Sequence, residues 1–283
     1  MREVFIISVP GTWETRDATK PMPPTGMTAL VHREFGELMA GERHDWHVTN
    51  WSVPYTSGYG DKASYESSVA KGKRNLKSML KAVPPGALIF LVGYSQGATI
   101  AGDVFLEWVQ NSEGLSMDDL EIEAYYGISD PRRNPGEIIG PDPGGQGITG
   151  ARGDFRWASR RVYQFCAPGD IIASSDPGTD LFQEISVFTN RFWVGDVLGW
   201  VGYSLSILGS PSFQKRVRDE YGYKGVAGYL SFRSKLRRTV DRGINYLRSN
   251  VHTSYGKYKV GKRTVPEWIA NDIARKLSEM EPS

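Results

Sequence analysis

The stretch ALIFLVGYSQGA at residues 87–98 carries the strongest indication of the fold of this chain. Its first six residues are uniformly apolar, as expected for a strand that is buried on both faces of a sheet. Residues 93–97 match the pattern G-x-S-x-G, in which a tight strand-to-helix turn presents a serine hydroxyl. Residues 98–110 then repeat apolar side chains at helical spacing. A strand, a tight turn and a helix therefore follow one another around Ser95.

The same alternation of strand and helix patterns continues on both sides of this stretch. Short β-branched or aromatic runs predict strands, and longer runs with apolar residues every three or four positions predict helices. Strands are expected at residues 4–9, 46–53, 87–92, 122–128 and 162–166, and helices at 28–40, 64–81, 98–110 and 266–279. This order predicts an α/β fold with a mostly parallel central sheet flanked by helices.

Length alone allows one domain or two, and because the sequence shows no internal repeat or interdomain linker, one globular domain is expected over residues 1–283. The chain has 40% hydrophobic and 23% charged residues, which excludes disorder as its main state. A net charge of +2 is too small to indicate a nucleic-acid partner. The single cysteine, Cys166, excludes an internal disulfide.

No segment is expected to direct the chain into or across a membrane. The apolar run near the N-terminus is short, follows Glu3 and precedes no small-residue cleavage site, so it is interpreted as a strand rather than a signal peptide. The longest later apolar stretch, residues 194–208, contains Asp196 and falls short of the roughly 20 residues that span a bilayer.

A serine nucleophile needs a base, and the base needs an acid that orients it. In this type of fold the chain order is serine, acid, histidine, and of four histidines only His252 follows Ser95. Asp170 is the favoured acid, because it follows the predicted strand 162–166 by one turn and so lies at the carboxyl edge of the sheet. Asp130 also follows a predicted strand and is the main alternative. Other aspartates between the serine and the histidine are further candidates, among them Asp142, Asp154, Asp176 and Asp180.

Two backbone N–H groups are expected to bind the oxyanion. Gln96 offers one at the start of the helix that follows Ser95. Thr12, in the loop after the first strand, is the candidate for the other, with Trp13 as the second choice and an ordinary turn as the alternative interpretation. No pair of histidines has the spacing or acidic neighbours of a zinc site, so neither a metal nor a cofactor is expected. His32 is expected on the polar side of its helix.

Residues 181–247 form a predicted helical insertion between the acid and the histidine. Residues 215–248 hold ten Lys or Arg and three Asp or Glu, a net charge of +7 against +2 for the whole chain. An apolar cluster precedes them, formed by Phe192, Trp193, Val194, Leu198, Trp200 and Val201. One interpretation is a mobile cover in which Trp193 and Trp200, with Trp13, contact substrate acyl chains. The alternative is that the cluster is the insertion's own core and the charges its solvated face.

Four motifs resemble those of one enzyme family. They are PGTW at residues 10–13, GYSQGA at 93–98, FCAPGDII at 165–172 and NVHTSY at 250–255. With the helical insertion, they resemble the lysin B esterases of mycobacteriophages, which are relatives of the cutinases. The resemblance runs over nearly the whole chain. It implies a cutinase-like α/β-hydrolase fold, a triad of Ser95, Asp170 and His252, and hydrolysis of the ester that joins mycolic acids to arabinogalactan.

The expected function is that of a serine esterase acting on this lipid-bearing cell-wall polymer during phage lysis. A cutinase-like lipase for other esters is the nearest alternative. An inactive α/β-hydrolase fold used for binding is the second, and the intact serine, aspartate and histidine argue against it. Without disulfides or a signal peptide, the chain is expected to be made in the host cytoplasm, released on lysis, and then to contact outer envelope lipid. The sequence indicates no oligomeric state.

Overall fold

The computed structural model describes residues 2–16, 18, 20–42, 44–55, 64–110, 120–188 and 197–280. Strands and helices alternate as far as the fifth strand, and the described chain beyond it is helical apart from one short hairpin. The elements are β1 (Arg2–Val9), α1 (Gly26–Met39), β2 (Trp46–Ser52), α2 (Tyr65–Lys81), β3 (Leu88–Tyr94), α3 (Gln96–Val109), β4 (Glu121–Ile128), the 3-10 helix η1 (Arg156–Arg161), β5 (Val162–Phe165), α4 (Phe182–Phe188), α5 (Val197–Leu208), α6 (Pro211–Glu220), α7 (Gly225–Ser249), the 3-10 turn η2 (Val251–Thr253), β6 (Lys259–Val260), β7 (Arg263–Thr264) and α8 (Val265–Glu279).

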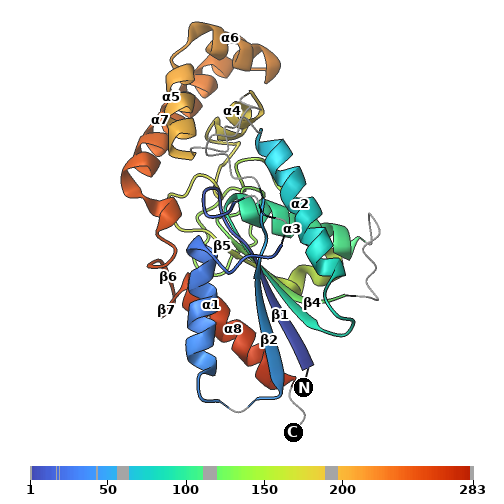
Figure 1. The fold of residues 1–283 in the computed structure, drawn as a ribbon. Helices are drawn as coiled ribbons and strands as arrows, with labels where there is room; N and C mark the ends of the chain where they lie inside the picture. The colour runs from blue at the N-terminus through green and yellow to red at the C-terminus, as the bar shows by residue number, and fades with distance from the viewer. Residues whose placement is uncertain are drawn as a thin grey trace.

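Five parallel strands form the central sheet in the order β2-β1-β3-β4-β5 (Figure 1). All seven residues of β3, the middle strand, are buried, which explains why its sequence shows no polar alternation. The sheet and its flanking helices confirm the predicted α/β fold, including the helices inserted between Asp170 and His252.

Side chains of β3 alternate between two cores, one on each face of the sheet. Ile89 and Leu91 pack with α2 and α3, whereas Phe90 and Val92 pack with α1 and α8. Figure 1 shows these two helix pairs on opposite sides of the strands. The apolar stripes of the four helices are therefore what cover the sheet.

The strand order changes direction between β1 and β3, because β2 lies on one side of β1 and β3 on the other. Ligands of open α/β sheets bind beyond the carboxyl ends of the strands at such a point. Val9 and Gly93 are paired at these ends. Thr12 follows β1 and Ser95 follows β3, so the fold brings both to the place where a ligand is expected.

Helices α4 to α7 build a third core together with the loop after β5. It contains Phe182, Val201, Phe232 and Tyr246, and it extends to Ile171. Figure 1 shows α5, α6 and α7 at the opposite end of the molecule from the two termini. Val201 is fully buried here, so this member of the predicted apolar cluster belongs to the helices' own core.

Some features differ from the sequence-based expectation. The predicted elements agree with the observed ones to within two residues at most ends, but η1 and the β6–β7 hairpin were not predicted. Two-residue strands are too short to show a periodicity. No helix in the described parts of the chain is both long and apolar enough to cross a bilayer.

The prediction for His32 was wrong, because its side chain is buried rather than on the polar side of α1. Its Nδ1 atom lies 2.7 Å from Asn50 Oδ1, and its Nε2 atom contacts the Ser8 hydroxyl. Burial lowers the pKa of His32 to about 4, although the hydrogen bond with Asn50 acts in the opposite direction. A neutral imidazole therefore joins α1 to β1 and β2.

Candidate active site

Ser95 occupies the turn between β3 and α3 with a backbone strain that suits a nucleophile. Its φ of 54° and ψ of −123° lie in a region that side chains other than glycine rarely adopt. A Cβ atom on Gly97 would lie 2.0 Å from the carbonyl oxygen of Val9. The glycine is therefore required for α3 to approach the end of β1, as the G-x-S-x-G pattern predicts.

The imidazole of His252 lies between the serine and the predicted acid. Its Nε2 atom is 2.9 Å from Ser95 Oγ, and its Nδ1 atom is 3.1 Å and 3.3 Å from the two carboxylate oxygens of Asp170. His252 sits in η2, directly after Asn250, which ends α7 in the left-handed conformation. The hydroxyl of Tyr94 donates a 2.7 Å hydrogen bond to the His252 carbonyl and fixes this turn. The structure thus brings the three predicted residues into hydrogen-bonding order.

Asp170 is fully buried and receives several hydrogen bonds. Tyr255 donates at 2.7 Å, the backbone N–H of Ile172 donates at 3.1 Å, and the Ser129 hydroxyl donates to the same oxygen as Tyr255. Burial by itself raises the pKa of Asp170, but the interaction with His252 and the hydrogen bonds outweigh it, so the pKa lies below its usual value. The carboxylate is therefore held in the charged form that orients an imidazole.

Ser129 contacts both the acid and the base, although it is not among the site residues predicted from the sequence. Besides donating to Asp170, its Oγ atom lies 3.0 Å from His252 Nδ1. Its backbone has a φ of 52°, in the left-handed region, directly after β4. Its position after a predicted strand could have indicated a role in the site, but the adjacent Asp130 has a side chain that is more typical of a catalytic acid. The second missed residue, Tyr255, lies within the NVHTSY motif.

Asp130, the alternative acid, has a different partner. Its carboxylate forms a bidentate ion pair with Arg152 at 2.5 Å and 3.0 Å, and Gln164 donates to it at 2.9 Å. Burial raises the pKa of Asp130, but the charge and hydrogen bonds of Arg152 outweigh this and lower it. Both side chains of the pair are fully buried. Asp130 is therefore neutralised within the core rather than oriented toward the histidine.

The loop after β1 brings the predicted oxyanion residues to the nucleophile. Thr12 Oγ1 donates a 3.3 Å hydrogen bond to the side-chain oxygen of Gln96. Gln96 is the first residue of α3, where a backbone N–H has no partner within the helix. Glu14 holds the loop in shape, because its carboxylate accepts from the backbone N–H groups of Gly11 at 3.0 Å and Met27 at 2.8 Å. Burial raises the pKa of Glu14 despite these bonds.

A pocket of about 170 Å³ opens at the nucleophile. Trp13 is among its lining residues and has a left-handed φ of 71°. Of the other two tryptophans predicted to bind substrate, Trp193 lies outside the described residues, and Trp200 lies in α5 with a side chain that is likewise outside the description. The pocket is lined by Thr12, Trp13, Glu14, Tyr94, Ser95, Tyr246, Asn250, His252 and Thr253.

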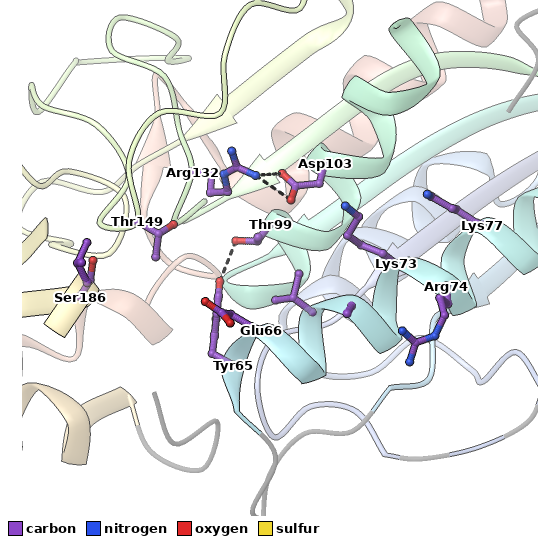
Figure 2. A pocket seen from close by; sticks show the side chains of 13 residues that line it. Tyr65, Glu66, Lys73, Arg74, Lys77, Thr99, Asp103, Arg132, Thr149 and Ser186 are labelled. Carbon is purple, nitrogen blue, oxygen red and sulfur yellow. Dashed lines mark hydrogen bonds and ion pairs between the residues drawn. The ribbon is translucent and has the colours of Figure 1, made fainter. Parts of the chain in front are cut away.

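A larger cavity, of about 600 Å³, lies between α2 and α3 and is separate from this pocket (Figure 2). Ser95, His252 and Asp170 are not among its lining residues. Its charged walls are largely paired, since Arg132 binds Asp103 at 2.8 Å and Lys77 binds Glu107 at 2.6 Å. Size alone therefore does not identify the reactive site. In the described ranges, no group of three or more His, Cys, Asp or Glu is arranged to hold a metal ion.

Comparisons of the sequence find one family model and one curated relative that are similar to this chain. A model of the family described as the PE-PPE domain matches residues 49–144, which include Ser95. A protein of Corynebacterium glutamicum named carboxylesterase Culp6 homolog is 27% identical over 205 residues. The match covers 61% of this chain and 65% of the relative, so the chain spans just under two thirds of the relative's length.

Two solved structures are also similar to this chain. The catalytic core domain of acetyl xylan esterase from Trichoderma reesei is 16% identical, with a TM-score of 0.45 over 68% of this chain and 96% of that one. A cutinase-like protein from Cryptococcus sp. is 17% identical, with a TM-score of 0.43 over 68% of this chain and 89% of that one. The chain is thus similar over part of its length to a protein named as a carboxylesterase, and its serine, histidine and aspartate are arranged as a nucleophile with its base and acid.

Proposed function

We propose that this protein is a serine esterase that works through an acyl-enzyme. The observation that carries the proposal is the 2.9 Å contact between Ser95 Oγ and His252 Nε2, with the buried carboxylate of Asp170 behind the imidazole. A serine hydroxyl beside such a base is an activated nucleophile. The match to a carboxylesterase supports the same class of reaction.

The proposed reaction proceeds in two halves. Ser95 Oγ attacks the ester carbonyl carbon while His252 Nε2 accepts the serine proton, and the Nδ1–H group is oriented toward Asp170. The backbone N–H groups of Gln96 and Thr12 stabilise the oxyanion. The alcohol leaves with the proton from His252, and water then attacks acyl-Ser95 by the same route.

We propose further that the substrate is the ester between mycolic acids and arabinogalactan in a mycobacterial-type envelope. The four motifs that resemble lysin B esterases support this choice. The pocket of about 170 Å³ is smaller than the 300–1,000 Å³ typical of small-molecule sites, so a long acyl chain extends beyond it. Trp13, which is 43% exposed, borders the pocket, and Trp193 and Trp200 are proposed as further acyl contacts.

The setting proposed for this reaction follows from the same resemblance. The chain acts as one domain in which α4 to α7 cover the site, and it is made in the host cytoplasm and released on lysis. A cutinase-like lipase that accepts other lipid esters is the second candidate, and the carboxylesterase relative favours it.

The reaction is tested by labelling the nucleophile. A serine-directed fluorophosphonate should modify Ser95, identified by mass spectrometry of peptides, and block turnover. Ser95→Ala should lose roughly 10³-fold or more of the activity, because the triad residues act as a unit. Ser67→Ala, an exposed serine at the start of α2, is the matched control and should keep full activity. An adduct on another residue of active protein would overturn the assignment.

The substrate is tested separately. Mycolyl-arabinogalactan and nitrophenyl esters of graded chain length are incubated with the enzyme, and released acids are measured. Release of mycolic acids supports the envelope substrate. Hydrolysis of the nitrophenyl esters alone would favour the general lipase.

A further inference from the structure

The start of α7 exposes a group of large apolar side chains to solvent. Val226 is 78% exposed, Leu230 is 61% exposed and Tyr229 is 43% exposed. In the described part of the chain, Val226 and Leu230 are the two most exposed of the large apolar side chains. Single exposed apolar residues are ordinary, but here three lie close together on one helix, with Arg218 over the ring of Tyr229 at 5.6 Å.

Arginines extend this group along one face of α7. Val226, Leu230, Arg233 and Arg237 follow one another at intervals of three or four residues and therefore share a face. The side chain of Arg237 is 87% exposed. The opposite face holds the buried residues Phe232, Thr239, Gly243 and Tyr246, which pack into the third core. We call Val226, Tyr229, Leu230, Arg233 and Arg237 the α7 patch.

The positive charge around the α7 patch limits the kinds of partner that can bind to it. Residues 215–248 carry a net charge of +7, and their acidic residues are Asp219, Glu220 and Asp241. A second copy of the chain would set two such surfaces against each other, which costs energy through like-charge repulsion. A nucleic acid would engage the arginines but would leave Val226 and Leu230 without an apolar partner.

We propose that the α7 patch docks on an anionic lipid surface. Aliphatic and aromatic side chains on a helix with flanking arginines are the features that insert between lipid headgroups. Each arginine near an anionic surface adds attraction that salt weakens. The proposal does not depend on ester hydrolysis, because the patch contains none of the residues of the catalytic pocket.

The length of α7 separates docking from catalysis. Val226 and Tyr246 are 20 residues apart on one helix, a distance of about 30 Å at 1.5 Å per residue. Tyr246 lines the catalytic pocket, and Arg237, the member of the α7 patch nearest to it in the helix, is nine residues or about 14 Å away. Docking through the apolar side chains of the α7 patch therefore requires no lipid contact at the pocket itself.

Vesicle binding tests the proposal with the full chain. Co-sedimentation is measured with vesicles of phosphatidylcholine alone and with equal parts of phosphatidylcholine and phosphatidylglycerol. The wild type should bind the anionic vesicles at least tenfold more strongly. The double variant Val226→Ser, Leu230→Ser should lose at least tenfold of that binding, and Arg233→Gln, Arg237→Gln should lose more than tenfold together with part of the salt dependence. Both variants should hydrolyse a soluble short-chain ester at the wild-type rate, which also reports that they fold.

Matched controls are available elsewhere on the surface. Leu38→Ser removes a leucine that is 42% exposed on α1, and Arg74→Gln removes an exposed arginine on α2. Both should bind anionic vesicles like the wild type. Equal binding to neutral and anionic vesicles, or equal loss in the control variants, would overturn the proposal. So would self-association through the α7 patch in sedimentation, or binding to duplex DNA that is stronger than binding to the vesicles.

Discussion

Ser129 is a residue through which acid and base are positioned together. Its hydroxyl donates to Asp170 and lies 3.0 Å from His252 Nδ1, so the Nδ1–H group points between the carboxylate and the hydroxyl. Ser129→Ala should slow turnover by about 10- to 100-fold, since a hydrogen bond to a charged group contributes about 1.5–3 kcal/mol. Steady-state turnover of a soluble ester across pH measures the effect.

Ser129→Gly provides the control for this variant. Glycine also lacks the hydroxyl but accepts the left-handed backbone at this position without strain. It should therefore be as slow as Ser129→Ala but more stable in urea. Turnover of Ser129→Ala within twofold of the wild type would show that the hydroxyl does not position the base.

Substitutions of Asp170 and Asp130 should have different effects, the first on turnover and the second on stability. Asp170→Asn should reduce turnover by roughly 10³- to 10⁴-fold, because the amide favours the wrong tautomer of His252. Asp130→Asn should instead lower the free energy of unfolding by about 3 kcal/mol, because the buried Arg152 loses its bidentate carboxylate and keeps only the contact of its Nε atom with Asp103. Turnover per folded molecule and urea unfolding distinguish them. A greater loss of turnover at Asp130 would mean that the wrong acid has been assigned.

Sequence reasoning found the residues of the site whose positions follow from chain order. Ser95 follows a buried strand, His252 is the only histidine after it, and Asp170 follows the last parallel strand. Ser129 and Tyr255 could not be found in this way, because their role depends on which side chains meet across the ends of different strands.

At the scale of elements, α1 is joined to the sheet by a buried histidine. The pKa of His32 is about 4 in the folded protein and about 6.5 in the unfolded chain. The unfolded state therefore binds more protons between these values, so stability is full above pH 6.5 and falls as the pH decreases toward 4. The loss amounts to about 3 kcal/mol.

His32→Gln should remove this dependence. Urea unfolding of the wild type and of the variant is measured from pH 7 to pH 4, and the difference between their free energies of unfolding is compared. Carboxylates titrate equally in both proteins and cancel in the difference. Parallel pH profiles would show that His32 is not neutral in the fold.

The elements themselves were predicted more securely than their contacts. The strand 87–92 was evident because burial on both faces excludes polar residues, and the observed β3 extends only one or two residues from it. The burial of His32 was missed because the helical pattern of α1 marks its main apolar stripe but not the edge of that stripe. Hairpin β6–β7 depends on contacts too local to leave a pattern.

At the scale of the whole molecule, α7 is anchored to the loop after β5. Arg242 binds the buried carboxylate of Asp180 and the carbonyl of Ser174. Arg242→Met should lower the free energy of unfolding by about 2–3 kcal/mol, because the Asp180 carboxylate loses its cation. It should also slow ester turnover, because α7 leads directly into the turn that carries His252.

Arg242→Lys is the control, since it keeps the charge and should retain most of the free energy of unfolding and most of the ester turnover. Urea unfolding and steady-state turnover provide the two measurements. If Arg242→Met changes neither, the position of His252 does not depend on this anchor.

The anchor has a mechanical consequence for the catalytic base. Near its middle, α7 is held by Arg242 and by Thr239, whose hydroxyl accepts from the backbone N–H of Leu181 at 2.8 Å. At 1.5 Å per residue, about 24 Å of helix lies between Arg242 and Val226 and about 12 Å between Arg242 and Asn250. The third core holds α7 on both sides of Arg242, through Phe232 and Tyr246. His252, two residues beyond Asn250, is thus carried at the end of a braced helix, which keeps the base 2.9 Å from Ser95 Oγ.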